Sequence, residues 1–221
     1  LIVADQLCAA AGVFTTNDVK AGPVRISQAT LLSSQGRVRG VIANSGNANA
    51  CTSSQGDADA VRMAQLGAEA AGHAGEAFLV CSTGRIGELL PMAKVAAGAT
   101  AAAARLSRDS AEGVRAANAI LTSDTRPKTC TARFTWQGQT VTIAGLIEPM
   151  TSDAGFALAS SLHHRATSSH HRNSTSCPTS VRPDAVMTLM IRLVPVTSNP
   201  SPRGSLAMPM ASSTALVLRI R

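Results

Sequence analysis

Two neighbouring groups in the segment Ser82-Thr83-Gly84 could stabilise negative charge on a carbonyl oxygen. Thr83 offers a side-chain hydroxyl, and Gly84 offers a backbone N–H that no side chain shields. Donors of this kind, held beside a reacting carbonyl, form the oxyanion hole of acyl-transfer sites. The same residues are common in ordinary loops, so the segment alone does not distinguish a catalytic turn from a structural one.

A strand and a helix are expected on either side of this segment. The apolar residues 78–81 (FLVC) have the length of a buried strand. Pro91 suits the first turn of a helix, because its missing N–H needs no partner there. We therefore predict a strand, a tight turn at residues 82–84, and an alanine-rich helix over residues 91–106.

Two further segments carry polar groups without much bulk. Residues 44–51 (NSGNANAC) offer many hydrogen-bond donors and acceptors, either to a ligand or, as an Asx-turn loop, to their own backbone. Residues 121–128 (LTSDTRPK) combine hydroxyls, a carboxylate and two cations, which complement the charges of an amino acid. They could equally be the solvated end of a helix, with cations near the negative end of its dipole.

The remaining pattern mixes helices and strands, which predicts an α/β (α+β) fold. Two short strands are expected at residues 1–4 and 12–16, and a third at residues 39–43. Helices are expected at residues 23–34, at residues 58–71 with Asp57 as N-cap, and from Ser110 to about Ile120. Residues 131–136 and 139–143 alternate apolar and polar side chains around Gln137-Gly138, which predicts a β-hairpin with a two-residue turn.

Charge divides the chain into two parts. Residues 1–155 hold 13 Lys and Arg against 12 Asp and Glu, whereas residues 156–221 hold seven Arg against one Asp. The first part is nearly neutral, as expected for a domain that binds small molecules, and the net charge of +7 resides mainly in the second. We predict a domain at 1–155 and a basic, Ser-, His- and Pro-rich, irregular tail at 156–221, in which the apolar runs at residues 186–191 and 215–218 could form short strands.

Composition argues against several classes of partner. The five cysteines show no metal-ligand spacing or disulfide framework, so we expect no metal and a reducing, cytoplasmic location. The 221 residues contain no Tyr, one Trp and four Phe, so aromatic platforms for nucleic-acid bases are scarce and nucleic-acid binding is not expected. No apolar run has the length of a membrane span, and no charged leader precedes one.

Four segments together resemble one family. They are residues 10–24 (AAGVFTTNDVKAGPV), 41–60 (VIANSGNANACTSSQGDADA), 79–94 (LVCSTGRIGELLPMAK) and 119–128 (AILTSDTRPK). Their sequences, order and approximate spacing are similar to the amino-terminal half of the arginine-biosynthetic ornithine acetyltransferases, also called bifunctional glutamate N-acetyltransferases. The resemblance covers roughly residues 1–150, about two-thirds of the chain.

The resemblance implies a layered fold like that of amino-terminal-nucleophile enzymes and a precursor that cleaves itself before a threonine. That threonine takes the acetyl group of N-acetylornithine, with its own α-amino group as base, and passes it to glutamate. No cofactor is implied, although acetyl-coenzyme A is a co-substrate of some members, and the cleaved chains form an alpha/beta hetero-oligomer. By motif match, Thr83 and Gly84 would form the oxyanion hole and Thr122 would contact substrate.

The chain departs from the family pattern after the predicted hairpin. The family has Lys-Gly, then Ile-x-Pro and a nucleophile segment, whereas this chain reads AGLIEPMTSDA over residues 144–154. Thr151 is the nearby candidate nucleophile, and an alignment that deletes the nucleophile segment would exclude it. The fold is therefore expected to be incomplete. Two other functions stay open: a non-catalytic protein whose Arg-rich tail binds anions, and a related aminopeptidase.

Overall fold

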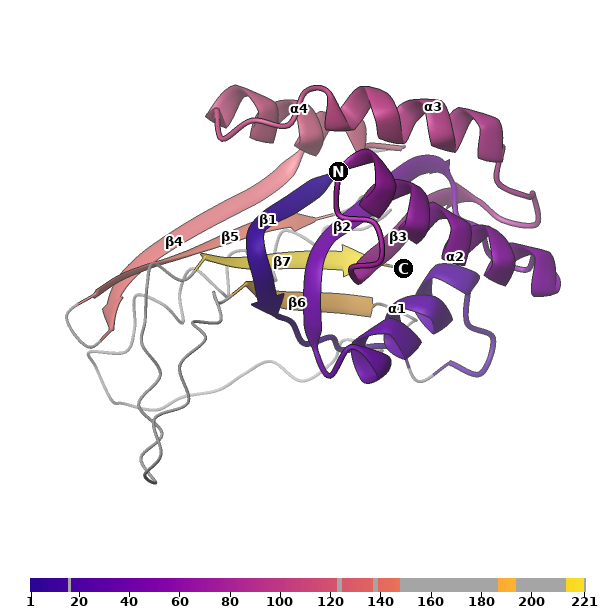
Figure 1. The fold of residues 1–221 in the computed structure, drawn as a ribbon, viewed down its shortest axis with the longest axis horizontal. Helices are drawn as coiled ribbons and strands as arrows, with labels where there is room; N and C mark the ends of the chain where they lie inside the picture. Colours follow the sequence, from indigo (N-terminus) through magenta and orange to yellow (C-terminus); the bar gives the residue numbers. More distant parts are fainter. Residues whose placement is uncertain (16, 123–124, 137–138, 148–186, 194–213, 221) are drawn as a thin grey trace.

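The computed structural model describes residues 1–15, 17–122, 125–136, 139–147, 187–193 and 214–220. Figure 1 shows these residues as two β-sheets with helices beside them. The mixture of helices and strands confirms the expected α/β content.

The first sheet has the strand order β1-β2-β3. Strand β1 (Ile2–Ala9) pairs antiparallel with β2 (Arg37–Asn47), and β2 pairs parallel with β3 (Phe78–Arg85). The parallel pairing continues without interruption to the partners Asn47 and Arg85. Helix α1 (Gly22–Ser33) precedes β2, and α2 (Ser53–Ala70) connects β2 to β3.

The second sheet has the strand order β4-β5-β7-β6. Strands β4 (Lys128–Trp136) and β5 (Gln139–Ile147) form the predicted hairpin, with Trp136 opposite Gln139. Strands β6 (Met187–Leu193) and β7 (Thr214–Ile220) pair antiparallel with each other, and β7 pairs parallel with β5. These two strands coincide with the apolar runs at residues 186–191 and 215–218, so the part of the expected tail that the structure describes is not irregular.

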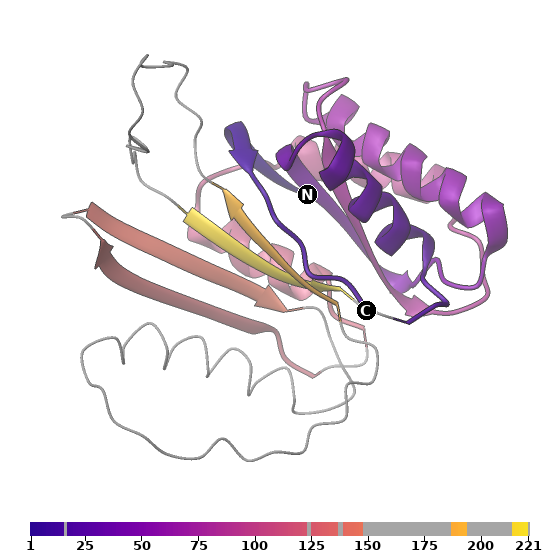
Figure 2. The same cartoon turned by 90° about the horizontal axis from the view of Figure 1, so that it is seen from below.

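The two faces of the first sheet are covered differently. Figure 2 shows helices α1 and α2 on one side of it and the second sheet on the other. Because side chains alternate along a strand, Val41 and Leu79 pack toward Leu146 of β5, whereas Ile42 and Val80 pack toward α2 and α3. This alternation produces two apolar clusters, one on each side of β2 and β3.

Two helices follow β3 along the chain. Helix α3 (Met92–Ala103) has Pro91 as its N-cap, and α4 (Ser110–Ala119) has Asp109, whose carboxylate accepts the Ala111 N–H at 3.0 Å. Ala99 of α3 belongs to the cluster with α2, and Ala117 of α4 belongs to the cluster with β5. Both helices lie close to where they were predicted.

Four local predictions are wrong. Residues 82–84 are not a tight turn, because β3 continues through them, and residues 44–47 likewise extend β2. Their small side chains allow the two strands to stay paired to their ends. The strand expected at residues 1–4 is present but extends as β1 through Ala9, and residues 12–15 do not form the second strand. Helix α2 begins at Ser53, so Asp57 is inside it and pairs with Arg25 of α1 at 2.6 Å instead of capping it.

Candidate functional site

Two glycines lie side by side where β2 and β3 end. Gly46 and Gly84 are ladder partners, and both have positive φ, 95° and 131°. A Cβ atom on Gly84 would lie 2.2 Å from the carbonyl carbon of Gly46. Only a glycine at position 84 allows the two strands to come this close, because a side chain there would collide with the backbone of Gly46. At the end of β3 the backbones of residues 84 and 46 are therefore in direct contact, with no side chain between them.

Thr83 is buried beside this glycine pair. Its side chain is 4% exposed, and its hydroxyl makes no hydrogen bond with any residue that the structure describes. The Oγ of the preceding Ser82 is also buried without a partner among the described residues. Buried hydroxyls usually have partners, so the unpaired Ser82 Oγ marks this strand end as unusual.

The hydrogen bonds of β3 show which way its backbone N–H and C=O groups point. The Ser27 hydroxyl of α1 accepts the Val80 N–H at 3.0 Å and donates to the Val80 carbonyl at 2.8 Å, on the side away from β2. In contrast, the Arg85 carbonyl accepts the Ala48 N–H at 2.8 Å, toward the chain that follows β2. Because backbone groups alternate along a strand, the Gly84 N–H is directed, like that of Val80, to the edge of β3 away from β2.

The segment with Thr122 begins close to this strand end. The Ser45 hydroxyl of β2 donates to the Ala119 carbonyl, the last residue of α4, at 2.7 Å. Ser45 is the ladder partner of Thr83. Thr122 follows Ala119 by three residues and is exposed. The Ser45 bond thus ties the chain leading to Thr122 to the strand beside Thr83. Thr151 lies outside the described residues.

Residues 44–52, which include the NSGNANAC segment, divide into two halves with different surroundings. Asn49 is fully buried with φ 46°, its Nδ2 donates to the Gly56 carbonyl at 2.7 Å, and its Oδ1 accepts the Thr52 hydroxyl at 2.8 Å. Asn47 Oδ1 accepts the Asn49 N–H at 2.8 Å, as an Asx turn requires. This later half therefore holds the start of α2.

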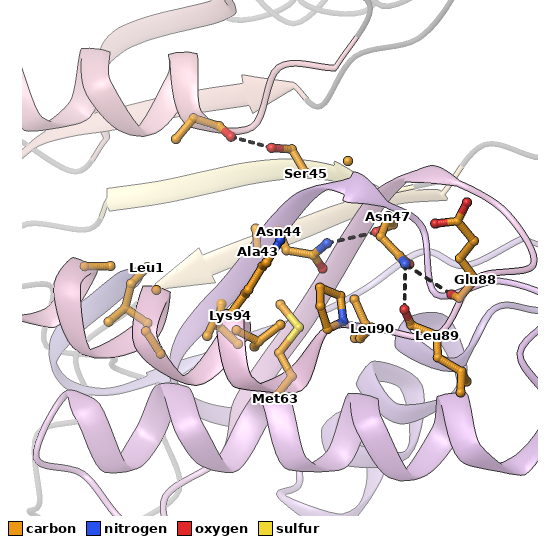
Figure 3. A pocket seen from close by; sticks show the side chains of 18 of the residues that line it. Leu1, Ala43, Asn44, Ser45, Asn47, Met63, Glu88, Leu89, Leu90 and Lys94 are labelled. Atoms are coloured by element: carbon orange, nitrogen blue, oxygen red, sulfur yellow. Dashed lines mark hydrogen bonds between the residues drawn. The ribbon is translucent and has the colours of Figure 1, made fainter.

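The earlier half of the same segment borders a cavity of about 630 Å³ (Figure 3). The cavity lies between the end of β2, the residues after β3, and α3. Neither Thr83 nor Gly84 lines it. Sequence reasoning missed this cavity, because its wall is shared by α3 and β2, which are about 50 residues apart in the chain. The only sequence signal was the cluster of asparagines.

A bidentate ion pair lies at the other end of the sheet. Arg39 of β2 forms a bidentate pair with Glu76, just before β3, with Arg39 Nη2 to Glu76 Oε1 at 3.1 Å. The hydrogen bond from Arg39 lowers the pKa of the Glu76 carboxyl below its ordinary value, and it raises the pKa of Arg39. The pair fixes the entry to β3 and lies away from Gly84.

Two other kinds of feature are absent from the described residues. No group of three His, Cys, Asp or Glu side chains there is placed to hold a metal ion. No helix in that part of the chain combines the length and apolar character needed to cross a bilayer.

Comparison with known proteins identifies relatives of this chain. A model of the ArgJ family matches residues 1–148. The arginine biosynthesis bifunctional protein ArgJ of Symbiobacterium thermophilum is 51% identical over 156 residues, which are 67% of this chain and 38% of that protein. The ArgJ protein of Caldanaerobacter subterraneus is 40% identical over 174 residues, or 76% of this chain and 42% of the relative. The chain thus spans about two-fifths of the length of these relatives.

Two solved structures are similar to this fold. The ArgJ protein of Bacillus halodurans matches with a TM-score of 0.62 and 34% identity, over 67% of this chain and 76% of that one. An ornithine acetyltransferase from Mycobacterium tuberculosis, solved with ornithine, matches with a TM-score of 0.53 and 40% identity, over 57% and 66% of the two chains. The family match covers more than half of the chain, and sequence and fold agree with it. The chain belongs to the ArgJ family.

Proposed function

We propose that this chain serves acetyl transfer from N-acetylornithine to glutamate in arginine biosynthesis. The Thr83 hydroxyl and the Gly84 N–H would hold the acetyl oxygen as it becomes negative. The observation that carries the proposal is the strand end itself: a buried threonine whose hydroxyl has no partner among the described residues, next to an N–H directed away from β2. Donors fixed in this way stabilise an oxyanion without reorganising during the reaction.

The reaction would proceed in two steps through an acetyl-threonine. A threonine hydroxyl attacks the acetyl carbonyl, and the tetrahedral intermediate collapses with loss of the ornithine α-amine. The α-amine of glutamate then attacks the acetyl ester and regenerates the hydroxyl. In this chain Thr151 is the candidate nucleophile and Thr122 the candidate substrate contact, and acetyl-coenzyme A is a candidate alternative acetyl donor.

An acetyl-transfer assay tests the proposal. Acetyl transfer from N-acetylornithine to glutamate is measured for the full chain and for Thr83→Ala, with Thr100→Ala as control. Thr100 is exposed on α3 and bonds only the Ala96 carbonyl of its own helix, at 3.2 Å. Loss of one oxyanion donor is expected to lower kcat by about 10² to 10³, whereas the control keeps its activity. Equal activity of Thr83→Ala and the unaltered chain would refute the role of Thr83.

The role of Thr151 has its own test. Self-cleavage before this residue would give two bands on a denaturing gel, and end-sequencing of the smaller fragment would begin at Thr151. The Thr151→Ala variant should give a single band and no transfer. An unchanged band pattern or unchanged transfer in this variant would show that another residue is the nucleophile.

A second candidate function rests on the charge of residues 156–221. Seven Arg and one Asp give this part a net charge of +6, which favours binding to polyanions. A non-catalytic protein of this kind would show no acetyl transfer. It would instead bind DNA in a salt-sensitive manner, and it would lose that binding when residues 156–221 are removed.

A further inference from the structure

The polar groups that line the cavity beside α3 are nearly all used within the protein. The Ser45 hydroxyl donates to the Ala119 carbonyl, and the Asn47 amide donates to the carbonyls of residues 88 and 89 at 3.1 and 3.0 Å. Arg85 pairs with Glu88 at 3.2 Å. These groups hold the wall of the cavity together, so a ligand would have to compete with them for contacts.

Two polar side chains in the lining remain available, and the α-amino group of Leu1, whose pKa is lowered by burial, also belongs to a lining residue. Asn44 Nδ2 donates to the Asn47 carbonyl at 2.9 Å, which fixes the orientation of the amide, and leaves Oδ1 buried with no partner among the described residues. The Lys94 ammonium of α3, at the exposed mouth, likewise has no ion pair with a described residue. Figure 3 shows Asn44 on β2 and Lys94 on α3, with Met63 of α2 below them.

The rest of the lining is mostly apolar. It includes Ile42 of β2, Met63 of α2, and Leu90, Val95 and Ala99 on or next to α3. A volume of about 630 Å³ lies within the range of small-molecule sites, which are typically apolar with a few fixed polar groups. An unpaired buried acceptor is unfavourable, so a ligand that supplies a donor to Asn44 gains from the contact.

We propose that this cavity binds a carboxylic acid that has one N–H or O–H donor and an uncharged aliphatic chain. The carboxylate pairs with Lys94, the donor binds Asn44 Oδ1, and the aliphatic chain lies along Ile42, Met63 and Val95. The site is separate from Thr83 and Gly84, which do not line the cavity, and it does not depend on acetyl transfer.

A truncation series of ligands tests each contact by calorimetric titration of the full chain. The parent probe is 2-aminooctanoate, octanoate lacks the donor, and heptylamine lacks the carboxylate. We expect each truncation to weaken binding about tenfold, while 2-hydroxyoctanoate, which keeps a donor, binds like the parent. Equal binding of octanoate and 2-aminooctanoate would overturn the role of Asn44. L-Ornithine, with a charge in the apolar part, should bind more weakly than the parent, and tighter binding would assign the cavity to the amino-acid substrates instead.

Matched variants test the location. Gly98 of α3 lines the cavity, and a Cβ atom added there meets nothing within 4 Å, so Gly98→Leu adds an apolar side chain at the cavity wall. Gly113 of α4 has the same open surroundings but does not line it, so Gly113→Leu is the control. We expect binding to fall at least tenfold in Gly98→Leu alone. Unchanged binding in Gly98→Leu would show that the ligand binds elsewhere.

The cation is tested in the same way. Lys94→Gln should weaken 2-aminooctanoate about tenfold and leave heptylamine, which has no carboxylate, unaffected. Lys20→Gln is the control, because Lys20 does not line the cavity. An equal loss for both probes in Lys94→Gln would indicate a packing effect and would overturn the proposed ion pair.

Discussion

The two halves of residues 44–52 belong to one polar segment but differ in whether their buried polar groups have hydrogen-bond partners. In the later half, Asn49 is fully buried and both ends of its amide are bonded, to Gly56 and Thr52. In the earlier half, Asn44 keeps an unpaired Oδ1, beside a cavity and opposite Ser82, whose hydroxyl is also unpaired. Saturated polar groups hold a fold, whereas buried unsaturated ones mark places where a ligand could bind.

The largest expected effect comes from a substitution at the end of β3, beside the earlier half of the segment. Gly84→Ala places a Cβ atom 2.2 Å from Gly46 at a φ of 131°, and should lower the free energy of unfolding by about 4 kcal/mol. The control Gly87→Ala shares a positive φ of 83° but meets nothing within 4 Å, so it should cost about 1 kcal/mol. Urea unfolding followed by circular dichroism measures both, and equal costs would show that the close approach does not matter.

The next largest effect is expected in the later half of the segment, where both ends of the Asn49 amide are hydrogen-bonded. Asn49→Ala removes the donor to Gly56 and the acceptor for Thr52, and leaves buried groups unpaired. We expect a loss of about 3 kcal/mol in the free energy of unfolding. A loss below 1 kcal/mol in the same urea experiment would contradict the structural role of this asparagine.

A smaller effect is expected where α1 closes the edge of β3. Ser27→Ala leaves both backbone groups of Val80 without the Ser27 hydroxyl, and should cost about 2 kcal/mol. Ser33 of the same helix is exposed and bonds only the Thr30 carbonyl at 3.2 Å, so Ser33→Ala should change stability by less than about 0.5 kcal/mol. Thermal unfolding of the two variants compares them, and equal midpoints would exclude a closing role for Ser27.

The smallest effect sharpens the contrast between the asparagines. Asn44→Ala loses one bond, to the Asn47 carbonyl, but also removes the unpaired buried oxygen. The two contributions oppose each other, so stability should change by less than about 1 kcal/mol. A loss as large as that of Asn49→Ala would show that the two halves of the segment do not differ.

Sequence reasoning located most of the elements but misjudged how far the strands extend. The hairpin was predictable because alternation around Gln137-Gly138 is a local signal, and β4 and β5 pair as that signal requires. The ends of β2 and β3 were not predictable, because Ser, Gly and Asn favour loops by local preference. Parallel pairing with a distant strand overrides that preference here.

The candidate site was predicted only in part. Thr83, Gly84 and Thr122 were selected for their chemical groups and their motifs, and the link through Ser45 and Ala119 became visible only in the fold. The cavity was not predicted, because its wall is formed by α2, α3 and β2 together.

The sequence by itself determined the alternating apolar positions, the helix starts near Pro91 and Ser110, and the motifs that place the chain in the ArgJ family. Only the tertiary structure decided which polar groups are saturated. Gly46 meets Gly84, and Asn44 rather than Asn49 keeps a free oxygen, because register and packing bring together partners that are far apart in the chain. Hydrogen-bond partners of buried groups depend on such contacts, which no local pattern specifies.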